Sequence, residues 1–410
     1  MSAAGSTGPT TPTGQPRPAR RYADVRTPPL PSRPLLTTPP HLLGREATNF
    51  ERARLAAQPG LGLVGILFVA AVFFPLAIGT GATETSLLIF GPLATFALAA
   101  IAMIAFWWND WPGSGLQAPL SGLVDTGLVI VAALVLTVLG QAIVESVDLH
   151  AILVAHPSPG RPTTFPATLA LGGTVFAAML QLTLVSEGWP LRALGRLRSG
   201  VVALAVSWAV AVAAYLLVVN TDAVPAALRA ATGLRNPGGP IAAADFGAAL
   251  VAVGVWQALF FIGLRGWPFR ELSTRWLRLA SGNAAVIGAG VVTYLVLHDL
   301  AHWQPGAIRA VCGCLITATL IVAMLFDGWP ASQVRPSQGR LLTLTLIALL
   351  TVALDRSLAA YAESVHWTKA TPDDWVTSAA LTFIGAGIIL HVAVGRRWPL
   401  TSASRTKATG

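Results

Sequence analysis

Charge is scarce in this sequence of 410 residues, because Lys, Arg, Asp and Glu together make up only 11% of it. A soluble domain carries roughly 25% of these residues. Apolar residues make up 54% of the chain, and its mean hydropathy is +0.65. The shortage of charge excludes an ordinary soluble protein and predicts an integral membrane protein whose main surroundings are the lipid bilayer.

Lysine is nearly absent, since Lys369 and Lys407 are the only two in the chain. The formal net charge of +9 therefore rests on arginine. Arginine-rich usage with abundant Ala, Gly and Pro is typical of a GC-rich bacterial genome, and it predicts the bacterial cytoplasmic membrane as the location. A basic balance can indicate nucleic-acid binding, but these arginines lie in loops beside apolar runs, where they set membrane topology. We expect no nucleic-acid partner.

Nucleotide-binding and hydrolase motifs are also missing. The sequence contains no P-loop, no dinucleotide fingerprint and no Gly-x-Ser-x-Gly elbow, which argues against ATP-driven transport and lipase-type hydrolysis. Cys312 and Cys314 are two residues apart and would point to opposite sides of a helix, so neither a local disulfide nor a metal clamp is expected. These absences favour a protein that is not an enzyme.

What the chain does have is a Trp-Pro pair at the end of five apolar runs. The tryptophans are Trp111, Trp189, Trp267, Trp329 and Trp398, at intervals of 78, 78, 62 and 69 residues. Three of the pairs follow a glycine, which suits a helix C-cap, and proline cannot continue the helix that it follows. Each Trp is expected to anchor its turn at the membrane interface. The intervals predict five tandem two-helix units.

About 20 apolar residues are needed to cross the hydrocarbon core of a membrane. Ten runs of suitable length are placed near 61–79, 86–107, 121–143, 166–186, 199–219, 242–263, 281–300, 307–326, 340–361 and 375–394. The predicted fold is therefore an all-α integral membrane protein with ten transmembrane helices in five tandem two-helix repeats. Gly288-Ala-Gly290 and Gly385-Ala-Gly387 are expected to supply small surfaces for close helix packing.

Arginines gather in the loops that follow even-numbered helices. These residues are Arg192, Arg196, Arg198, Arg265, Arg270, Arg275, Arg278, Arg335, Arg340, Arg396 and Arg397. By the positive-inside rule, both termini and every Trp-Pro turn lie in the cytoplasm. The expected topology is N-in and C-in, although the loop at 108–120 carries no Lys or Arg.

The two ends of the chain differ from its apolar body at 61–398. Residues 1–45 are rich in Pro and Arg and are expected to form a disordered cytoplasmic tail, which leaves open a protein partner for that tail. Residues 46–60 open with a capping-box pattern and predict an amphipathic juxtamembrane helix. Residues 399–410 are expected to form a cytoplasmic C-terminal tail.

Most histidines fall on the predicted outer side, together with several acidic residues. His298 and His302 are four residues apart in the seventh predicted helix, a spacing at which two imidazoles can hold one divalent ion. Asp299 and His366 are further ligand candidates. The alternative is that these side chains are simply solvated or complement the arginines of the inner side, and no cofactor is predicted beyond a divalent metal or haem at this rim.

Ionisable residues inside membrane segments are costly, so each is a candidate for function. Asp355 and Arg356 follow a 14-residue uncharged run that is too short to cross the membrane, and we expect each to find a partner on another helix. Gln141, Glu145 and Asp148 would share one face of the third helix. The predicted substrate or proton pathway is Asp355, Arg356, Glu145, Asp125 and Gln141.

Three functions fit these observations. The first is a permease for a small molecule or ion, with proton coupling left open, that uses the pathway residues above. The second is a membrane protein that binds a divalent metal or haem, or catalyses a reaction, at its outer His- and Asp-rich rim. The third is an assembly or scaffold protein. Nothing in the sequence identifies a substrate.

Overall fold

The computed structural model describes residues 54–79, 82–153 and 164–400, apart from positions 225, 227–228 and 231–232. The predicted tail at 1–45, most of the predicted helix at 46–60 and residues beyond 400 lie outside the described residues. The α-helices are α2 (Gly60–Ile78), α3 (Thr83–Ala102), α4 (Ala118–Val144), α5 (Leu169–Leu180), α6 (Arg196–Val218), α8 (Ala243–Gln257), α9 (Arg275–Leu295), α10 (Pro305–Leu320), α11 (Pro336–Glu363), α12 (Pro372–Thr377) and α13 (Ala386–Ile389). Two short parallel strands, β1 (Val219–Asn220) and β2 (Ile241–Ala242), connect α6 to α8.

Nine helical segments in the described ranges are long and apolar enough to cross a membrane. A tenth apolar helix, Leu169–Val185, is shorter and lies where the fourth span is predicted. The prediction of an all-α, multi-pass membrane protein is confirmed. The count of exactly ten crossings and the orientation in the membrane stay predictions.

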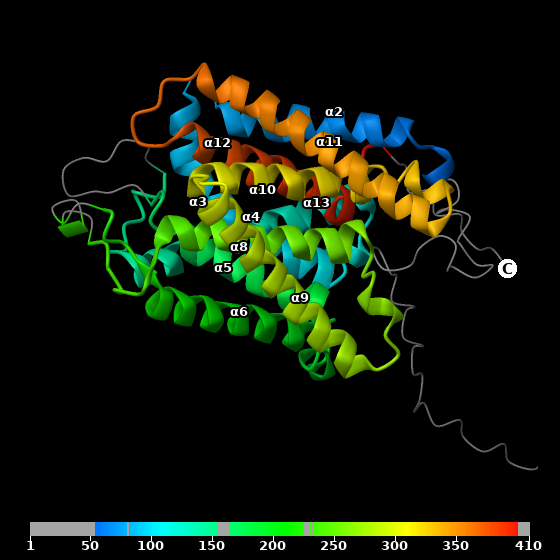
Figure 1. The fold of residues 1–410 in the computed structure, drawn as a ribbon, viewed down its shortest axis with the longest axis horizontal. Coiled ribbons are helices and arrows are strands. Elements are labelled where there is room, and N and C mark those ends of the chain that lie inside the picture. The colour runs from blue at the N-terminus through cyan, green and yellow to red at the C-terminus, as the bar shows by residue number, and fades with distance from the viewer. Residues whose placement is uncertain are drawn as a thin grey trace, which may run out of the picture. The chain divides into compact units, whose positions relative to one another are not determined.

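Five helical segments form a closed inner ring. Around it, α3 packs against α5, α5 against α8, α8 against α10, and α10 against the final segment Pro372–Val394, which returns to α3. Three of these inner segments are 72–78% buried, whereas the spans that contain α2, α6, α9 and α11 are only 17–28% buried. Figure 1 shows the helices running alongside one another, with α6 at one edge of the bundle and α2 and α11 at the other.

Each outer helix packs on the inner helix that directly precedes it in the chain. This holds for α4 on α3, α6 on α5, α9 on α8 and α11 on α10. Helix α2 is the first long helix of the described residues, and it packs on the final segment as well as on α3. Helices that are joined by a Trp-Pro turn therefore pack as pairs. The fifth pair consists of the final segment and α2, which are far apart in the sequence.

The five Trp-Pro turns share one local structure. Each inner helix ends in a π-helical segment, namely η1 (Met103–Trp107), η3 (Gln181–Val185), η5 (Ala258–Gly263), η8 (Ile321–Leu325) and η11 (Leu390–Val394). The two residues before each Trp have positive φ, and all five Trp-Pro peptide bonds are cis. The backbone N–H of the residue before Trp donates to the carbonyl six residues earlier, at 2.6–2.9 Å. The glycine C-caps predicted at three of these turns have this left-handed conformation.

Close packing at the predicted small residues is uneven. A Cβ on Gly290 of α9 would lie 2.6 Å from the Val253 α-carbon of α8, so the two backbones nearly touch. A Cβ on Gly288 of the same helix would meet no atom of the described residues within 4 Å. Gly387 resembles Gly290, because its Cβ would lie 2.6 Å from the Phe73 ring of α2.

We expect Gly290→Ala to destabilise the protein by about 1–3 kcal/mol, because the methyl group forces α8 and α9 apart. The control, Gly288→Ala, lies two residues away on the same helix and should be neutral or stabilise by up to ~1 kcal/mol through helix propensity. Thermal unfolding of both purified variants in one detergent checks this. Equal unfolding temperatures for the two variants would contradict the α8–α9 packing.

Candidate functional site

The five Trp-Pro turns contact one another through arginines in a closed cycle. We number the turns one to five from Trp111 to Trp398. The contacts are Arg196 to the Trp108 carbonyl, Arg278 to Glu187, Arg265 to the Asp327 carbonyl, Arg397 to Asp327, and Arg396 to Asp110. In turn order they join one to two, two to three, three to four, four to five, and five back to one. This end of the bundle, which we call the Trp-Pro end, is therefore held together by charged groups.

Asp327 is the most heavily used acceptor of this cycle. Its carboxylate oxygen Oδ1 lies 3.0 Å from Arg397 and 3.2 Å from Arg54, and its Oδ2 accepts from Gln58 at 2.9 Å. Burial lowers the pKa of Arg397 to about 10, with Asp327 opposing the shift and Arg54 adding to it. Because Arg54 and Gln58 precede α2, this carboxylate also ties the first helix to turns four and five.

A buried pair of acids lies between turns one and five. Asp110 is 4% exposed and Asp125, on α4, is 0% exposed. Arg396 binds Oδ2 of Asp110, whereas Oδ1 of Asp110 and Oδ2 of Asp125 have no hydrogen-bond donor in the described residues. Burial raises the pKa of Asp110 to about 7, Arg396 opposes this, and the adjacent Asp125 carboxyl raises it further. The contact with a second acid therefore favours the protonated form of Asp110.

Backbone geometry holds Asp125 in place. Its Oδ1 accepts from the Gly113 N–H at 3.0 Å. A Cβ at Gly113 would lie 2.2 Å from Oδ2 of Asp125 and 2.7 Å from the hydroxyl of Ser121, so only glycine fits there. Ser121, one turn before Asp125, is 0% exposed, and its hydroxyl has no partner in the described residues. The Asp125 carboxyl and the Ser121 hydroxyl therefore both lie against Gly113.

A buried stripe of residues at every fourth position follows α4 to the residue just past its end and winds around the helix by about 40° at each step. Its members are Ser121, Asp125, Val129, Ala133, Thr137, Gln141 and Glu145, all buried. Polar side chains occupy both ends of the stripe and two apolar side chains occupy its middle. With a rise of about 1.5 Å per residue, Asp125 and Glu145 lie about 30 Å apart, close to the thickness of a bilayer core.

Glu145 lies directly after α4 at the opposite end of the bundle. It is 1% exposed, and neither of its carboxylate oxygens has a donor in the described residues. Burial, with a smaller contribution from Asp148, raises the pKa of Glu145 to about 8. Gln141 donates to Thr164 at 2.9 Å and to the Asp148 carbonyl at 3.1 Å. The prediction that Gln141, Glu145 and Asp148 share one helical face is wrong, because α4 ends at Val144 and only Gln141 lies on it.

Asp355 and Arg356 lie on the outer helix α11. The Asp355 side chain is 20% exposed and that of Arg356 is 83% exposed, with 3.9 Å between Arg356 Nε and Asp355 Oδ2. The sequence predicts a partner on another helix for each, but in the described part of the chain the two side chains form an ion pair with each other instead. The guanidinium therefore points away from the bundle rather than into a pathway.

The histidine candidates do not share a helical face. Helix α9 ends at Leu295, a π-helical segment η7 (Val296–Leu300) carries His298 and Asp299, and His302 follows in a loop with φ of 57°. The prediction that His298 and His302 are four residues apart on one α-helix is therefore wrong, because α9 ends before both of them. His298 Nδ1 contacts the Trp303 carbonyl at 3.2 Å, and His366 is exposed after α11. Among the described residues no group of three potential ligands is placed to hold a metal ion. Metal or haem binding stays a prediction.

Sequence reasoning missed Asp110, Asp327, Arg396 and Arg397 as site residues. A signal was available, since the two positions before each Trp hold Asn-Asp, Glu-Gly, Arg-Gly, Asp-Gly and Arg-Arg, and each pair therefore contains a charge. Aligning the five turns would have shown that recurrence. Their partners could not be found in this way, because they come from other turns.

Comparison of the chain with family models, curated proteins and solved structures gives no match.

The buried Glu145 carboxyl predicts a specific dependence of stability on pH. Its pKa is about 8 in the folded protein against an ordinary 4.5, so the folded state binds the proton more tightly than the unfolded state. The free energy of unfolding should therefore fall as pH rises from about 4.5 to 8. Glu145→Gln cannot ionise and should escape this loss, gaining a few kcal/mol over the natural protein at pH 8, since one pKa unit is about 1.4 kcal/mol.

Thermal unfolding at pH 5 and pH 8 measures this gain. The exposed Glu363→Gln is the matched control and should follow the natural protein at both pH values. A Glu145→Gln curve parallel to that of the natural protein would show that Glu145 is ionised and satisfied in the fold.

Proposed function

We propose that this membrane protein is a permease for a small molecule or ion, coupled to protons that Asp125 and Glu145 exchange at the two ends of α4. The observation that carries the proposal is the buried stripe of α4, with a carboxyl oxygen lacking a donor at each end among the described residues. Burial of a carboxyl without a full counter-charge raises its pKa, as at Glu145 and at Asp110 beside Asp125. Such a group can release and take up a proton when its surroundings change.

The stripe also suits a gated route rather than an open pore. Val129 and Ala133 separate the polar ends, and the space between the inner helices is filled by apolar side chains such as Ile104, Leu259 and Ile388. Continuous proton or solute passage would therefore require the inner helices to move. The π-helical ends of the inner helices are candidates for this movement, because π segments are frequent at functional sites.

Asp125 has the surroundings that coupling requires. Its partner Asp110 is held by Arg396 of turn five, so movement of turn five would change the charge near the acid pair. Separating Arg396 from the pair favours proton uptake, and bringing it closer favours release. At the other end of α4, Gln141 would act together with Glu145. Asp355 and Arg356 lie on α11, outside this route.

For the orientation, we propose that the Trp-Pro end faces the cytoplasm of a bacterial cell, with both termini inside. The support is the arginine distribution, because residues of the turns and of the helix starts beside them carry many of the arginines in the chain. Cytoplasmic loops are enriched in such residues. In this orientation Asp125 is near the inner surface and Glu145 near the outer one.

Proton-coupled flux in proteoliposomes tests the proposal. A trapped pH-sensitive dye reports proton movement while amino acids, sugars, organic cations and inorganic ions are added in turn outside. We expect at least one class to drive proton flux, and Asp125→Asn to abolish it because the amide cannot exchange a proton. Glu363→Gln, an exposed acid outside the stripe, should keep it.

Two results would contradict the proposal. One is a proton flux that a well-folded Asp125→Asn variant retains at the natural rate. The other is the absence of solute-driven proton flux across all four classes in protein whose unfolding temperature shows that it is intact.

A further inference from the structure

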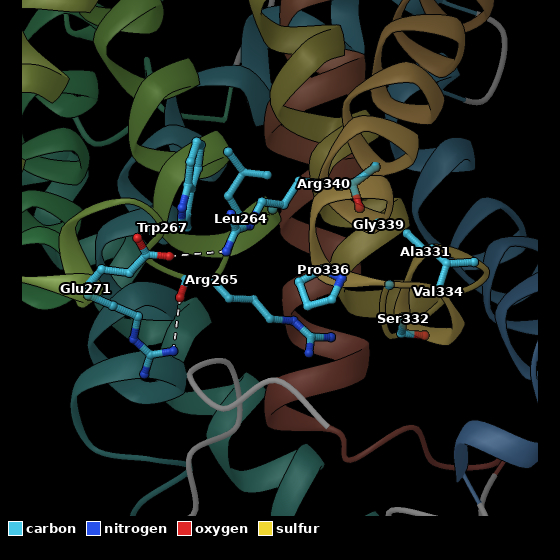
Figure 2. A pocket seen from close by; sticks show the side chains of 14 residues that line it. Leu264, Arg265, Trp267, Glu271, Ala331, Ser332, Val334, Pro336, Gly339 and Arg340 are labelled. Atoms are coloured by element: carbon cyan, nitrogen blue, oxygen red, sulfur yellow. Dashed lines mark hydrogen bonds and ion pairs between the residues drawn. The ribbon is translucent and has the colours of Figure 1, made fainter. Parts of the chain in front are cut away.

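A pocket of about 220 Å³ opens between turns three and four at the Trp-Pro end (Figure 2). Its wall combines residues of both turns with the first turn of α11, including Arg265, Trp267, Arg270, Glu271 and Arg340. The volume is below the roughly 300–1,000 Å³ of pockets for drug-sized ligands, so it fits one small group. This pocket lies apart from the α4 stripe, and neither Asp125 nor Glu145 lines it.

Positive charge dominates the pocket, where three guanidinium groups face one carboxylate. Glu271 accepts from Arg340 at 3.3 Å with both side chains partly exposed, so this pair neutralises little. Arg340 is also fixed over the Trp267 ring, 4.4 Å from its centroid. Arg270 donates to the Arg265 carbonyl and Arg265 to the Asp327 carbonyl, each at 3.0 Å.

Many donors of these arginines remain available. A guanidinium has five N–H donors, and each of the three has one protein acceptor among the hydrogen bonds of the described residues. Burial lowers the pKa of Arg265 and Arg270. Asp327 opposes this shift at Arg265 and Glu187 opposes it at Arg270, while a neighbouring arginine lowers each pKa further. Cations crowded in this way gain stability from an added anion.

The N-terminus of α11 also favours an anion in this pocket. Pro336 and Gly339 of the first turn of α11 line the pocket, and Figure 2 shows Arg265 extending beneath Pro336. The N-terminus of this 28-residue helix carries partial positive charge, which favours an anion. Arginine forks match the geometry of phosphate oxygens in particular.

We propose that this pocket binds a phosphate group, supplied by the headgroup of an anionic lipid or by a soluble phosphate. Arg270 and Arg340 are the main ligands, and Arg265 contributes while it holds Asp327. The site does not depend on transport, and it would remain if the chain had another activity.

Binding is tested on the purified full chain with two probes. One is inorganic phosphate added to the protein in detergent, and the other is reconstitution into nanodiscs of phosphatidylglycerol compared with nanodiscs of phosphatidylcholine. We expect phosphate or phosphatidylglycerol to raise the unfolding temperature and to be retained in native mass spectra. Arg270→Gln and Arg340→Gln should each weaken this binding about tenfold or more, because a charge-assisted hydrogen bond is lost.

Two further variants separate binding from folding and from general charge. Arg198→Gln removes an exposed arginine of the same end that does not line the pocket, and it should bind normally. Ser332→Leu fills the pocket while keeping all three arginines, and it should lose binding without loss of charge.

The responses to the two probes show whether the bound phosphate belongs to a lipid or to a soluble molecule, and whether the pocket binds phosphate at all. A response to both probes identifies a site open to soluble phosphate, and a response to phosphatidylglycerol alone identifies a lipid headgroup site. No response to either probe overturns the proposal. So does equal weakening by Arg198→Gln, because that outcome reflects overall charge rather than this pocket.

Discussion

The contact on which this fold depends is the one between neighbouring Trp-Pro turns. Each turn places its two residues before Trp in the left-handed region, and at least one of the two is charged. Side chains of these residues take part in four of the five contacts, including Arg396 on Asp110 and Arg397 on Asp327, whereas turns one and two meet through Arg196 and the Trp108 carbonyl. Removing one partner of a buried pair such as Arg397–Asp327, whose side chains are 6% and 10% exposed, typically costs about 3–5 kcal/mol.

Closure of the cycle explains why the first and last helices belong together. Helix α2 packs on the final segment, and Gln58 and Arg54 just before it bind Asp327. The same closure buries the start of α4, since Arg396 and Gly113 cover the Asp110–Asp125 pair. The proton site that we propose is therefore a consequence of how the ring of turns closes, and the Arg-rich pocket lies between two of those turns.

Much of the helical framework is predictable from the sequence, because apolar runs and Trp-Pro pairs are local signals. The predicted segment 199–219 corresponds to α6 at Arg196–Val218, and 121–143 to α4. Asp125 and Glu145 are also predictable as pathway candidates, since an acid in an apolar run must be buried or paired. Their burial is confirmed, whereas their role in a pathway remains a proposal.

Other features could not be predicted, because they depend on distant partners or on exact helix ends. Asp110 could not be identified as a site residue from the sequence, because its partner Arg396 is 286 residues away. The prediction that His298 and His302 share a helical face is wrong, because a π-helical segment replaces the last turn of α9. Sequence periodicity alone does not reveal such a change. Run length predicts an intramembrane position for Asp355 and Arg356, which stays a prediction. The partner expected for each on another helix is wrong, because the two side chains pair with each other on α11.

A double-mutant cycle on Asp110 and Arg396 tests ring closure most directly, because this pair joins the last turn to the first. The free energy of unfolding is measured for Asp110→Asn, Arg396→Gln and the double variant at one pH. Contact between the two side chains predicts that the double variant is more stable than the sum of the single losses implies, by about 1–3 kcal/mol. Single effects that add within about 0.5 kcal/mol would mean that turns five and one are not coupled, and the closed ring would be wrong.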